Sequence, residues 1–527
     1  AKPSQEGQIK EKFRTNASLN AFLWPVFGYE EAAKDVIEFM GKADLKKLSA
    51  EELEGLARAY EDRSNYSYLG NYGHSYDKSA SRAYDSTFDV STLDLKLMAE
   101  AEENAWNAIE CYKNMVAWHP EHLTILGTIK MKYANNPVAH YLNFEMFQQR
   151  ETAKKFMDAA EFTTDMTEMA KNYLRSCPPN AILITYGDND TYPLLYVQQK
   201  LKFRKDVTIV NASLMAVGRC IYYYTKLLPE SQRVKSSLGI DHYKLDVNNY
   251  LMVKSSIGND EYVPISKVFD YIKRQPTEPS SSGFNFFPFK KLQLTEDIRI
   301  DIKEPYLIKD KIFLLDLIAS NYPSRPICFA HSIRFTGVYG ELKNYMEQHG
   351  LVSVLTDSAG SNNTYLSRLN QSIVEEKLLK EFVYPKTEVS DDEYQPVLSL
   401  ISALHLDLMI EYKNEGDSIK AGEILAHLHE VMPIGKFKYG QTHLVLAKNC
   451  LELGDKSLGQ DHLKAYVTEL EEDLKEAKLP LEEKTALQRY YSRNDLKSIE
   501  KRIDYLISFT ESSDFRGLAN TFRKRLK

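Results

Sequence analysis

Two apolar runs that end abruptly in polar residues constrain the fold of this chain most. Residues 181–185 (AILIT) lead into YGDND at 186–190, and residues 207–210 (VTIV) lead into NAS at 211–213. Short, continuously apolar runs of this kind are typical of parallel strands buried on both faces of an α/β sheet. Two further β-rich runs at 326–330 and 351–355 alternate with helical patterns. We therefore predict a small Rossmann-like, mostly parallel α/β domain over residues 176–390.

One part of this predicted domain interrupts the alternation of strands and helices. Residues 228–305 contain the serine-rich segment SSSG at 280–283 and the alternating run IRIDI at 298–302. Alternation with a period of two residues indicates a half-buried strand rather than a helix. We therefore predict that residues 228–305 form an insertion with a small β element.

Helical patterns dominate both sides of the predicted sheet domain. Residues 1–175 carry apolar side chains at three- and four-residue spacing, and SAEE at 49–52 resembles a capping box at a helix start. Residues 391–527 follow an acidic linker and are again helical in pattern. We predict a mixed α and α/β protein in which tetratricopeptide-like helical regions at 1–175 and 391–527 flank the sheet domain.

The repeat signal is clearest in the C-terminal region. Tyr412, the dipeptide at 416–417 (GD), Ala421 and Pro433 fall on the offsets of a tetratricopeptide repeat. A second GD dipeptide at 454–455 follows 38 residues later, whereas the family spacing is about 34. An irregular helical bundle is the alternative for both helical regions.

Composition excludes several classes of function. The net charge of −7 and the isoelectric point near 6.0 argue against general nucleic-acid binding, which needs a basic face. No apolar run is long enough to cross a membrane. The five cysteines are dispersed and never spaced as CxxC, so neither a disulfide framework nor a zinc site is indicated, and we expect core residues. The chain begins at Ala1 without a methionine, which fits an exported chain after signal removal or an artificial expression start.

The polar residues that follow the predicted strands form the candidate site. If the strands are parallel, their ends bring together Gly187, Asp188, Asn189, Asp190, Asn211, Ser213 and His331, with Ser332 and Asp357 nearby. Open α/β sheets bind ligands at that edge, where helix N-termini carry partial positive charge. Asp188 and Asp190 are spaced to hold a divalent cation, alone or with a nucleotide-sugar, and His331 would serve as a base or ligand.

A purely structural role explains the same residues. Aspartate and asparagine after a strand also make Asx turns and cap the next helix, here a helix opening at 191–193 (TYP). A haloacid-dehalogenase-type phosphatase is excluded because Gly187 separates the strand from Asp188 and Tyr192 stands where a threonine is needed. No G-x-S-x-G, Walker or G-x-G-x-x-G motif occurs. The sequence therefore predicts no catalytic residue.

Three segments of this chain have a familiar sequence. They are PPNAILITYGDNDTYPLLYVQQ from residue 178 with RKDVTIVNASL from 204, KDKIFLLDLIASNYPSRPICFAHS from 309, and the C-terminal repeat around 416–417. Together they resemble the soluble C-terminal region of the Bacteroidetes protein-O-mannosyltransferase-like membrane-protein family. The resemblance covers roughly residues 170–470. Family members carry a multi-pass membrane region before this part, and this chain has helices of soluble pattern instead. The resemblance implies an envelope location facing the periplasm, and an α/β module joined to tetratricopeptide-like helices.

Two functions from different classes follow. The first is a non-enzymatic, periplasm-facing envelope scaffold or accessory subunit that binds other proteins through helical repeats, in an outer-membrane secretion or assembly complex. The alternative is a small-ligand protein that binds or modifies a sugar-nucleotide or glycan at the Asp188/Asp190 edge. Both functions place the protein in the periplasm or at the outer membrane.

Overall fold

The computed structural model describes residues 32–68, 82–124, 127–254, 261–277, 285–333, 336–360, 368–385, 395–480 and 496–526. The chain divides into two compact units. One contains residues 1–55, 115–132 and 384–527, and the other contains residues 56–114 and 133–383. The acidic linker at 389–393 lies outside the described residues, and the three-part domain division predicted from the sequence stays a prediction.

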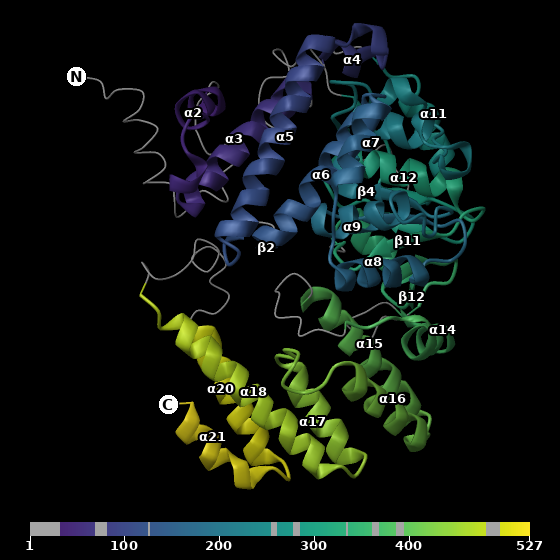
Figure 1. Cartoon of the computed structure of the whole chain (residues 1–527). Coiled ribbons are helices and arrows are strands. Elements are labelled where there is room, and N and C mark those ends of the chain that lie inside the picture. Colours follow the sequence, from purple (N-terminus) through teal and green to yellow (C-terminus); the bar gives the residue numbers. More distant parts are fainter. Residues whose placement is uncertain are drawn as a thin grey trace. The chain divides into compact units, whose positions relative to one another are not determined.

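The protein is a mixed helical and sheet protein, and helices dominate its N-terminal part (Figure 1). The predicted capping box is confirmed at the start of α3: the Ser49 N–H donates to Glu52 Oε2 at 2.9 Å, and the Glu52 N–H donates to Ser49 Oγ at 3.2 Å. The helices before the sheet are α2 (Ala32–Met40), α3 (Ala50–Tyr68), α4 (Arg82–Thr87), α5 (Leu95–Trp118), α6 (Ile129–Met146), α7 (Arg150–Ala159) and α8 (Thr164–Ser176).

A six-stranded sheet forms the centre of the second unit as far as the structure describes it, with strand order β14-β12-β13-β11-β3-β4. The four predicted strands are confirmed, and every residue in them is buried. Burial along a whole strand means that both sheet faces are covered, and Figure 1 shows β4 and β11 among α8, α9 and α12. The strands are β3 (Ile182–Thr185), β4 (Thr208–Asn211), β11 (Ile327–Ala330), β12 (Met346–His349), β13 (Val352–Leu355) and β14 (Arg368–Leu369).

The predicted, mostly parallel direction of this sheet is wrong for one of the four strands. β3, β4 and β11 are parallel, but β13 runs antiparallel to both β11 and β12. The reason is a tight β12–β13 hairpin in which His349 pairs with Val352. Gly350 lies at the turn with a φ of +76°, which only glycine adopts easily. The helix predicted at 340–348 is replaced by the short α13 (Val338–Leu342) followed by β12.

Helices α9 (Asp188–Gln199), α10 (Gly218–Tyr222) and α12 (Lys309–Asn321) complete the sheet region, together with short turns. The predicted insertion at 228–305 contains, within its described residues, strands of two small three-stranded sheets. One has the order β10-β5-β7, with β5 (Tyr250–Val253), β7 (Phe286–Phe287) and β10 (Tyr306–Ile308). The other has the order β6-β8-β9, with β6 (Val263–Pro264), β8 (Lys291–Gln293) and β9 (Arg299–Asp301), and α11 (Ile265–Ile272) follows β6.

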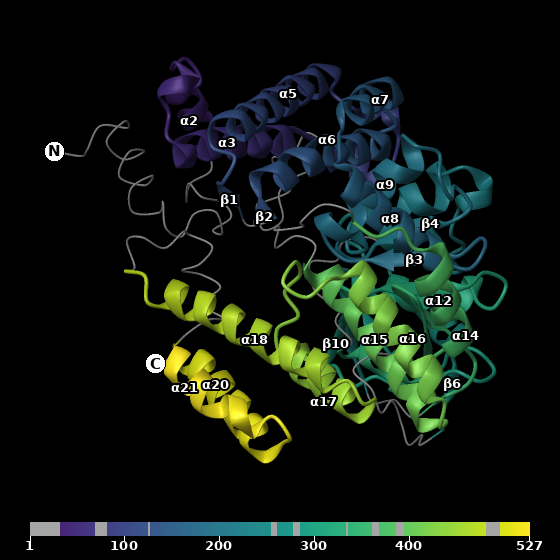
Figure 2. The ribbon, with the colours of Figure 1, turned by 60° about the horizontal axis from the view of Figure 1, so that its bottom comes forward.

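The C-terminal region is built from paired helices. α15 (Gln395–Asn414) packs against α16 (Ser418–Val431), and α17 (Thr442–Glu452) packs against α18 (Lys456–Ala477). In Figure 2, α18 lies beside α20 (Leu496–Ser512) and α21 (Ala519–Arg525), which share one apolar core with it. All five cysteines are buried and free, as predicted. None of the helices in the described ranges combines the length and the apolar character that crossing a bilayer requires.

Candidate functional site

The polar residues after β3, β4 and β11 lie at one edge of the sheet. Thr185 at the end of β3 pairs with Asn211 at the end of β4, and Ile184 pairs with Phe329 of β11. Parallel direction places the following loops side by side. The structure therefore brings the loop after β3 next to the loops after β4 and β11, as the sequence predicted.

Asp357 does not join this edge. Because β13 is antiparallel to β11, the residues after β13 lie at the opposite end of the sheet. Burial and the neighbouring Asp357 raise the pKa of Tyr322, which precedes the start of β11. The expectation that Asp357 completes the candidate site is therefore wrong.

Gly187 sets the start of α9. Its φ of +80° and ψ of −179° are open to glycine and strained for other residues, and the helix begins at the next residue. Asp188 and Asp190 thus occupy the first helical turn, where the helix dipole stabilises negative charge. The helix was predicted to open at residues 191–193, but it begins three residues earlier. Pro193 consequently lies in the second turn instead of the first.

Asp190 is the best-connected member of the site. Its Oδ2 accepts hydrogen bonds from the Tyr186 N–H at 3.1 Å and from the Ser332 hydroxyl. Burial raises the pKa of Asp190 to about 6, although these two hydrogen bonds oppose the shift. A carboxyl group that titrates near neutral pH at a sheet edge is a recognised mark of a functional site.

The neighbouring residues have different partners. Burial and the nearby Asp188, to which its hydroxyl is hydrogen-bonded, raise the pKa of Tyr192. Asn189 Oδ1 accepts a hydrogen bond from Asn135 Nδ2 at 2.6 Å. In the described part of the chain, no group of three or more histidine, cysteine or acidic residues is placed to hold a metal ion. The divalent cation at Asp188 and Asp190 stays a prediction.

Asn211 and Ser213 shape the loop after β4. Asn211 Oδ1 accepts from the Ser213 N–H at 3.0 Å and so caps the turn that follows β4. Ser213 Oγ in turn accepts from the Gly187 N–H at 3.1 Å, which joins this loop to the loop after β3. His331 directly follows β11 and its side chain is exposed. At this edge, the hydrogen bonds mainly tie one loop to the next.

Threonine hydroxyls in the same loop escaped the sequence analysis. Thr191 Oγ1 donates to the Gly187 carbonyl at 2.7 Å and lies 2.7 Å from the Thr185 hydroxyl. Both threonines are fully buried. The hydroxyl of a threonine can donate a hydrogen bond to the backbone carbonyl four residues earlier. The spacing of Gly187 and Thr191 in the sequence could therefore have indicated this contact.

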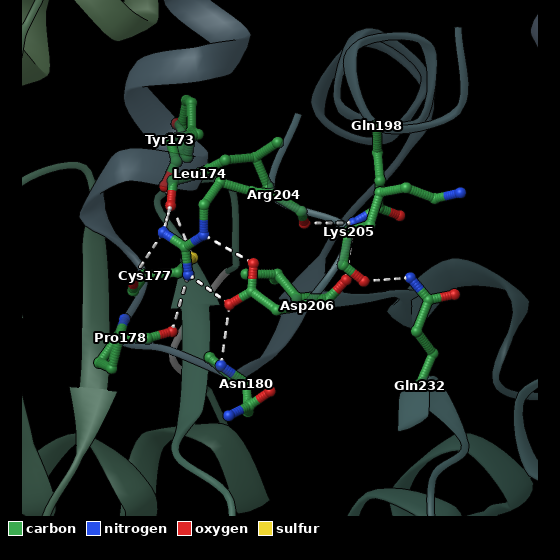
Figure 3. Close-up of polar contacts among 12 residues, drawn as sticks. Tyr173, Leu174, Cys177, Pro178, Asn180, Gln198, Arg204, Lys205, Asp206 and Gln232 are labelled. Carbon is green, nitrogen blue, oxygen red and sulfur yellow. Dashed lines mark hydrogen bonds and ion pairs between the residues drawn. The ribbon is translucent and has the colours of Figure 1, made fainter. Parts of the chain in front are cut away.

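A second polar cluster, at the opposite edge of the sheet, also escaped the sequence analysis (Figure 3). Arg204 donates to the carbonyls of Leu174, Cys177 and Pro178 at 2.7 to 3.1 Å, and to both carboxylate oxygens of Asp206 at 2.8 Å. Its hydrogen bond with Arg204 lowers the pKa of Asp206 to about 2. The guanidinium group fastens the end of α8 to the start of β4, so this cluster is structural.

Comparison with known proteins identifies the sheet region. Residues 166–297 and 290–373 match the family model described as TMEM260-associated domain 2. These residues run from α8 to just beyond β14 and make up less than half of the chain. The match is consistent with a protein-O-mannosyltransferase-like family. No curated protein and no solved structure matches the chain significantly.

Proposed function

We propose that this protein is a non-enzymatic accessory or scaffold subunit that binds other proteins through tetratricopeptide-like helix pairs. The observation that carries the proposal is the repeated construction of α15–α16 and α17–α18. Stacked helix pairs expose extended surfaces, and such surfaces are used to bind peptides and folded partners.

The turns between the paired helices are built in the same way. Gly416 has a φ of +86° and Gly454 a φ of +91°. The next residue caps the second helix in both pairs: Asp417 accepts from the Lys420 N–H at 3.0 Å, and Asp455 accepts from the Leu458 N–H at 2.9 Å. Equal chemistry at equal positions supports a repeat of one structural unit.

The two helix pairs are also linked to each other. Lys413 near the end of α15 donates to Asn449 Oδ1 of α17 at 2.7 Å and to the Glu452 carboxylate. Four residues after each capping aspartate stands a small buried residue, Ala421 or Gly459. These features support stacking of successive pairs, as a tetratricopeptide-like array requires.

The location is proposed from the resemblance to the Bacteroidetes family. An envelope protein facing the periplasm would present its helix pairs to other envelope subunits, and an outer-membrane secretion or assembly complex is the proposed setting. The family match covers only the sheet region and does not bear on the location.

The test is affinity purification of the full chain from solubilised native envelopes, with mass spectrometry of bound proteins. Ile419 of α16 and Val445 of α17 are 78% and 42% exposed, so glutamate at both positions changes the helix-pair surface without disturbing the core. We expect a stoichiometric envelope partner that the double variant I419E/V445E loses. The control is Leu95→Glu, at a position 70% exposed in the other unit, which should retain the partner. Equal recovery with both variants would contradict binding at this surface.

A second function is favoured by one specific observation, the raised pKa of Asp190 at the sheet edge. We propose as the alternative that this edge binds a sugar-nucleotide or glycan, through Asp188 and Asp190 and with a divalent cation. Binding to the native state would raise the melting temperature of the protein. The test is a melting-temperature screen with Mg²⁺, Mn²⁺ and nucleotide sugars, in the wild type and in Asp188→Asn. No shift in the wild type would exclude the alternative.

A further inference from the structure

Histidines connect the helices of the two pairs. Five of the chain's 12 histidines lie between residues 405 and 462. His405 of α15 contacts His427 of α16, with Nε2 and Nδ1 3.0 Å apart. His429 of α16, His443 of α17 and His462 of α18 form a second group. None of these rings belongs to a three-ligand metal group within the described residues.

The second group is a continuous hydrogen-bonded chain that ends on a carboxylate. His429 Nε2 lies 2.8 Å from His462 Nε2, and His462 Nδ1 lies 2.8 Å from His443 Nδ1. His443 Nε2 lies 3.2 Å from Glu469 Oε1. We call His429, His462, His443 and Glu469 the imidazole chain. It joins α16, α17 and α18, so its hydrogen bonds hold three helices together.

The number of protons that the imidazole chain accepts follows from its geometry. Each contact between two ring nitrogens needs one proton, because two bare nitrogens or two N–H groups repel each other. With all three rings neutral, His443 donates to Glu469, His462 donates to His443 and His429 donates to His462. One further proton fits, on Nδ1 of His429. A second further proton would put two N–H groups face to face.

The surroundings do not relieve this limit. His462 is fully buried, and burial with the two neighbouring imidazoles lowers its pKa to about 2. Burial also lowers the pKa of His429, although a backbone hydrogen bond with Leu425 and the nearby Asp455 oppose the shift. Glu469 is already engaged by the N–H groups of Tyr439 and Gly440. Among the described residues, the other titratable groups around the chain are His405 and Asp455 beside His429, the tyrosines Tyr439 and Tyr466, and the ion pairs Lys438–Glu472 and Arg502–Asp473.

We propose that the imidazole chain is a pH-sensitive lock, which holds α16, α17 and α18 together at neutral pH and opens them upon acidification. The closed state takes up at most one extra proton, whereas the open state takes up three, one on each histidine. The lock therefore opens with a net uptake of at least two protons. This inference does not depend on the proposed partner binding, but it would make a surface built from these helices responsive to pH.

Hydrogen exchange of the full chain between pH 7.5 and 5.0, corrected for the intrinsic pH dependence of exchange, tests the lock. Uptake of at least two protons predicts that the opening constant of α16–α18 rises by at least roughly 100-fold per pH unit below about pH 6. Amides of β3, β4 and β11 should change much less over the same range. A pH-independent opening constant in the wild type would overturn the proposal.

Two variants separate the imidazole chain from histidine burial in general. His462→Gln removes the central ring, and His429→Gln removes the terminal ring and serves where the first variant does not fold. Each should make the rise at least about tenfold smaller per pH unit than in the wild type, because the contacts that limit proton uptake are lost. The control His119→Gln, a histidine outside the helix pairs, should keep the wild-type rise. A wild-type slope in His429→Gln would contradict the lock.

Discussion

Asp190 in the first turn of α9 is hydrogen-bonded to Ser332, 142 residues further along the chain. This contact joins the loop after β3 to the loop after β11, the two central parallel strands of the sheet. The carboxyl group is held in place by Ser332 and by the Tyr186 N–H. The same carboxyl group therefore fastens the sheet edge and remains the strongest candidate there for ligand chemistry.

Asp190→Asn should make the stability less dependent on pH. Burial raises the pKa of Asp190 from 3.8 to about 6, so the folded state holds this proton more tightly than the unfolded state does. The stabilisation is complete below pH 3.8 and is lost as the pH rises through 6. It amounts to about 2–3 kcal/mol. Asparagine keeps an acceptor without the charge. Urea unfolding at pH 4 and pH 8 should show this decrease in the wild type but not in the variant.

Asp206→Asn is the control, because the pKa of Asp206 is shifted in the opposite direction to that of Asp190. Its carboxylate is bound by Arg204, and its pKa is lowered to about 2, so it stabilises the fold above pH 3.8. At pH 8 we expect Asp206→Asn to be less stable than the wild type, while Asp190→Asn is at least as stable. If the wild type and Asp190→Asn lose the same stability between pH 4 and pH 8, the raised pKa of Asp190 in the folded state would be contradicted.

Arg204→Lys should destabilise the protein although the charge is kept. The planar guanidinium group donates in several directions at once, to backbone carbonyls at the end of α8 and to Asp206. A lysine ammonium cannot reproduce that fork. We expect a loss of about 2–3 kcal/mol in the free energy of unfolding, measured by denaturant titration. Arg299→Lys, at an exposed position of β9, should remain within about 0.5 kcal/mol of the wild type.

Asp316→Asn should destabilise the protein, because an amide NH₂ group would replace an oxygen that accepts hydrogen bonds. The Asp316 carboxylate of α12 is fully buried. It accepts hydrogen bonds from the backbone N–H groups of Ser237 and Leu238 and from the hydroxyls of Ser236, Ser237, Tyr243 and Ser320. An amide would place its own donor against these donors. We expect a cost of about 3 kcal/mol in denaturant unfolding.

The exposed Asp270 offers the control for this substitution. Its side chain is 58% exposed and pairs with Lys273, three residues further along the chain. Asp270→Asn should therefore change the unfolding free energy by less than about 0.5 kcal/mol. Equal unfolding midpoints for Asp316→Asn and the wild type would show that Asp316 does not anchor the segment 236–243.

The strands of the sheet could be predicted from the sequence, but not all of their directions. Runs such as 182–185 and 327–330 are short and almost entirely apolar, and the first is rich in β-branched residues, so they favour buried strands. The direction of β13 depends on the hairpin at Gly350, which was hidden because residues 340–348 also fit a helical pattern. Burial alternates along Met346, Glu347, Gln348 and His349, but the buried Gln348 is polar, so the sequence shows no apolar alternation there.

The candidate site was predictable in its location but not in its contacts. Strand ends and a glycine before two acids indicate an edge of an α/β sheet, and the structure places them there. Which partner each side chain takes depends on long-range pairing: Asp190 with Ser332, Asn189 with Asn135. Local patterns carry no information about residues so distant in the chain.

Gly459→Ala should destabilise the helix pairs, because the crossing of α17 and α18 leaves no room for a methyl group. A Cβ at Gly459 would lie 2.7 Å from the Phe515 ring and 2.9 Å from the Ala447 carbonyl. Overpacking of this kind costs about 1–3 kcal/mol.

Gly422, inside α16, has nothing within 4 Å of such a Cβ. Gly422→Ala should therefore stabilise the protein by about 0.5–1 kcal/mol through helix propensity. Thermal unfolding of both variants distinguishes a crowded crossing from a general intolerance of alanine. If Gly459→Ala is as stable as the wild type, the crossing of α17 and α18 does not require a small residue, and it would no longer support a repeat.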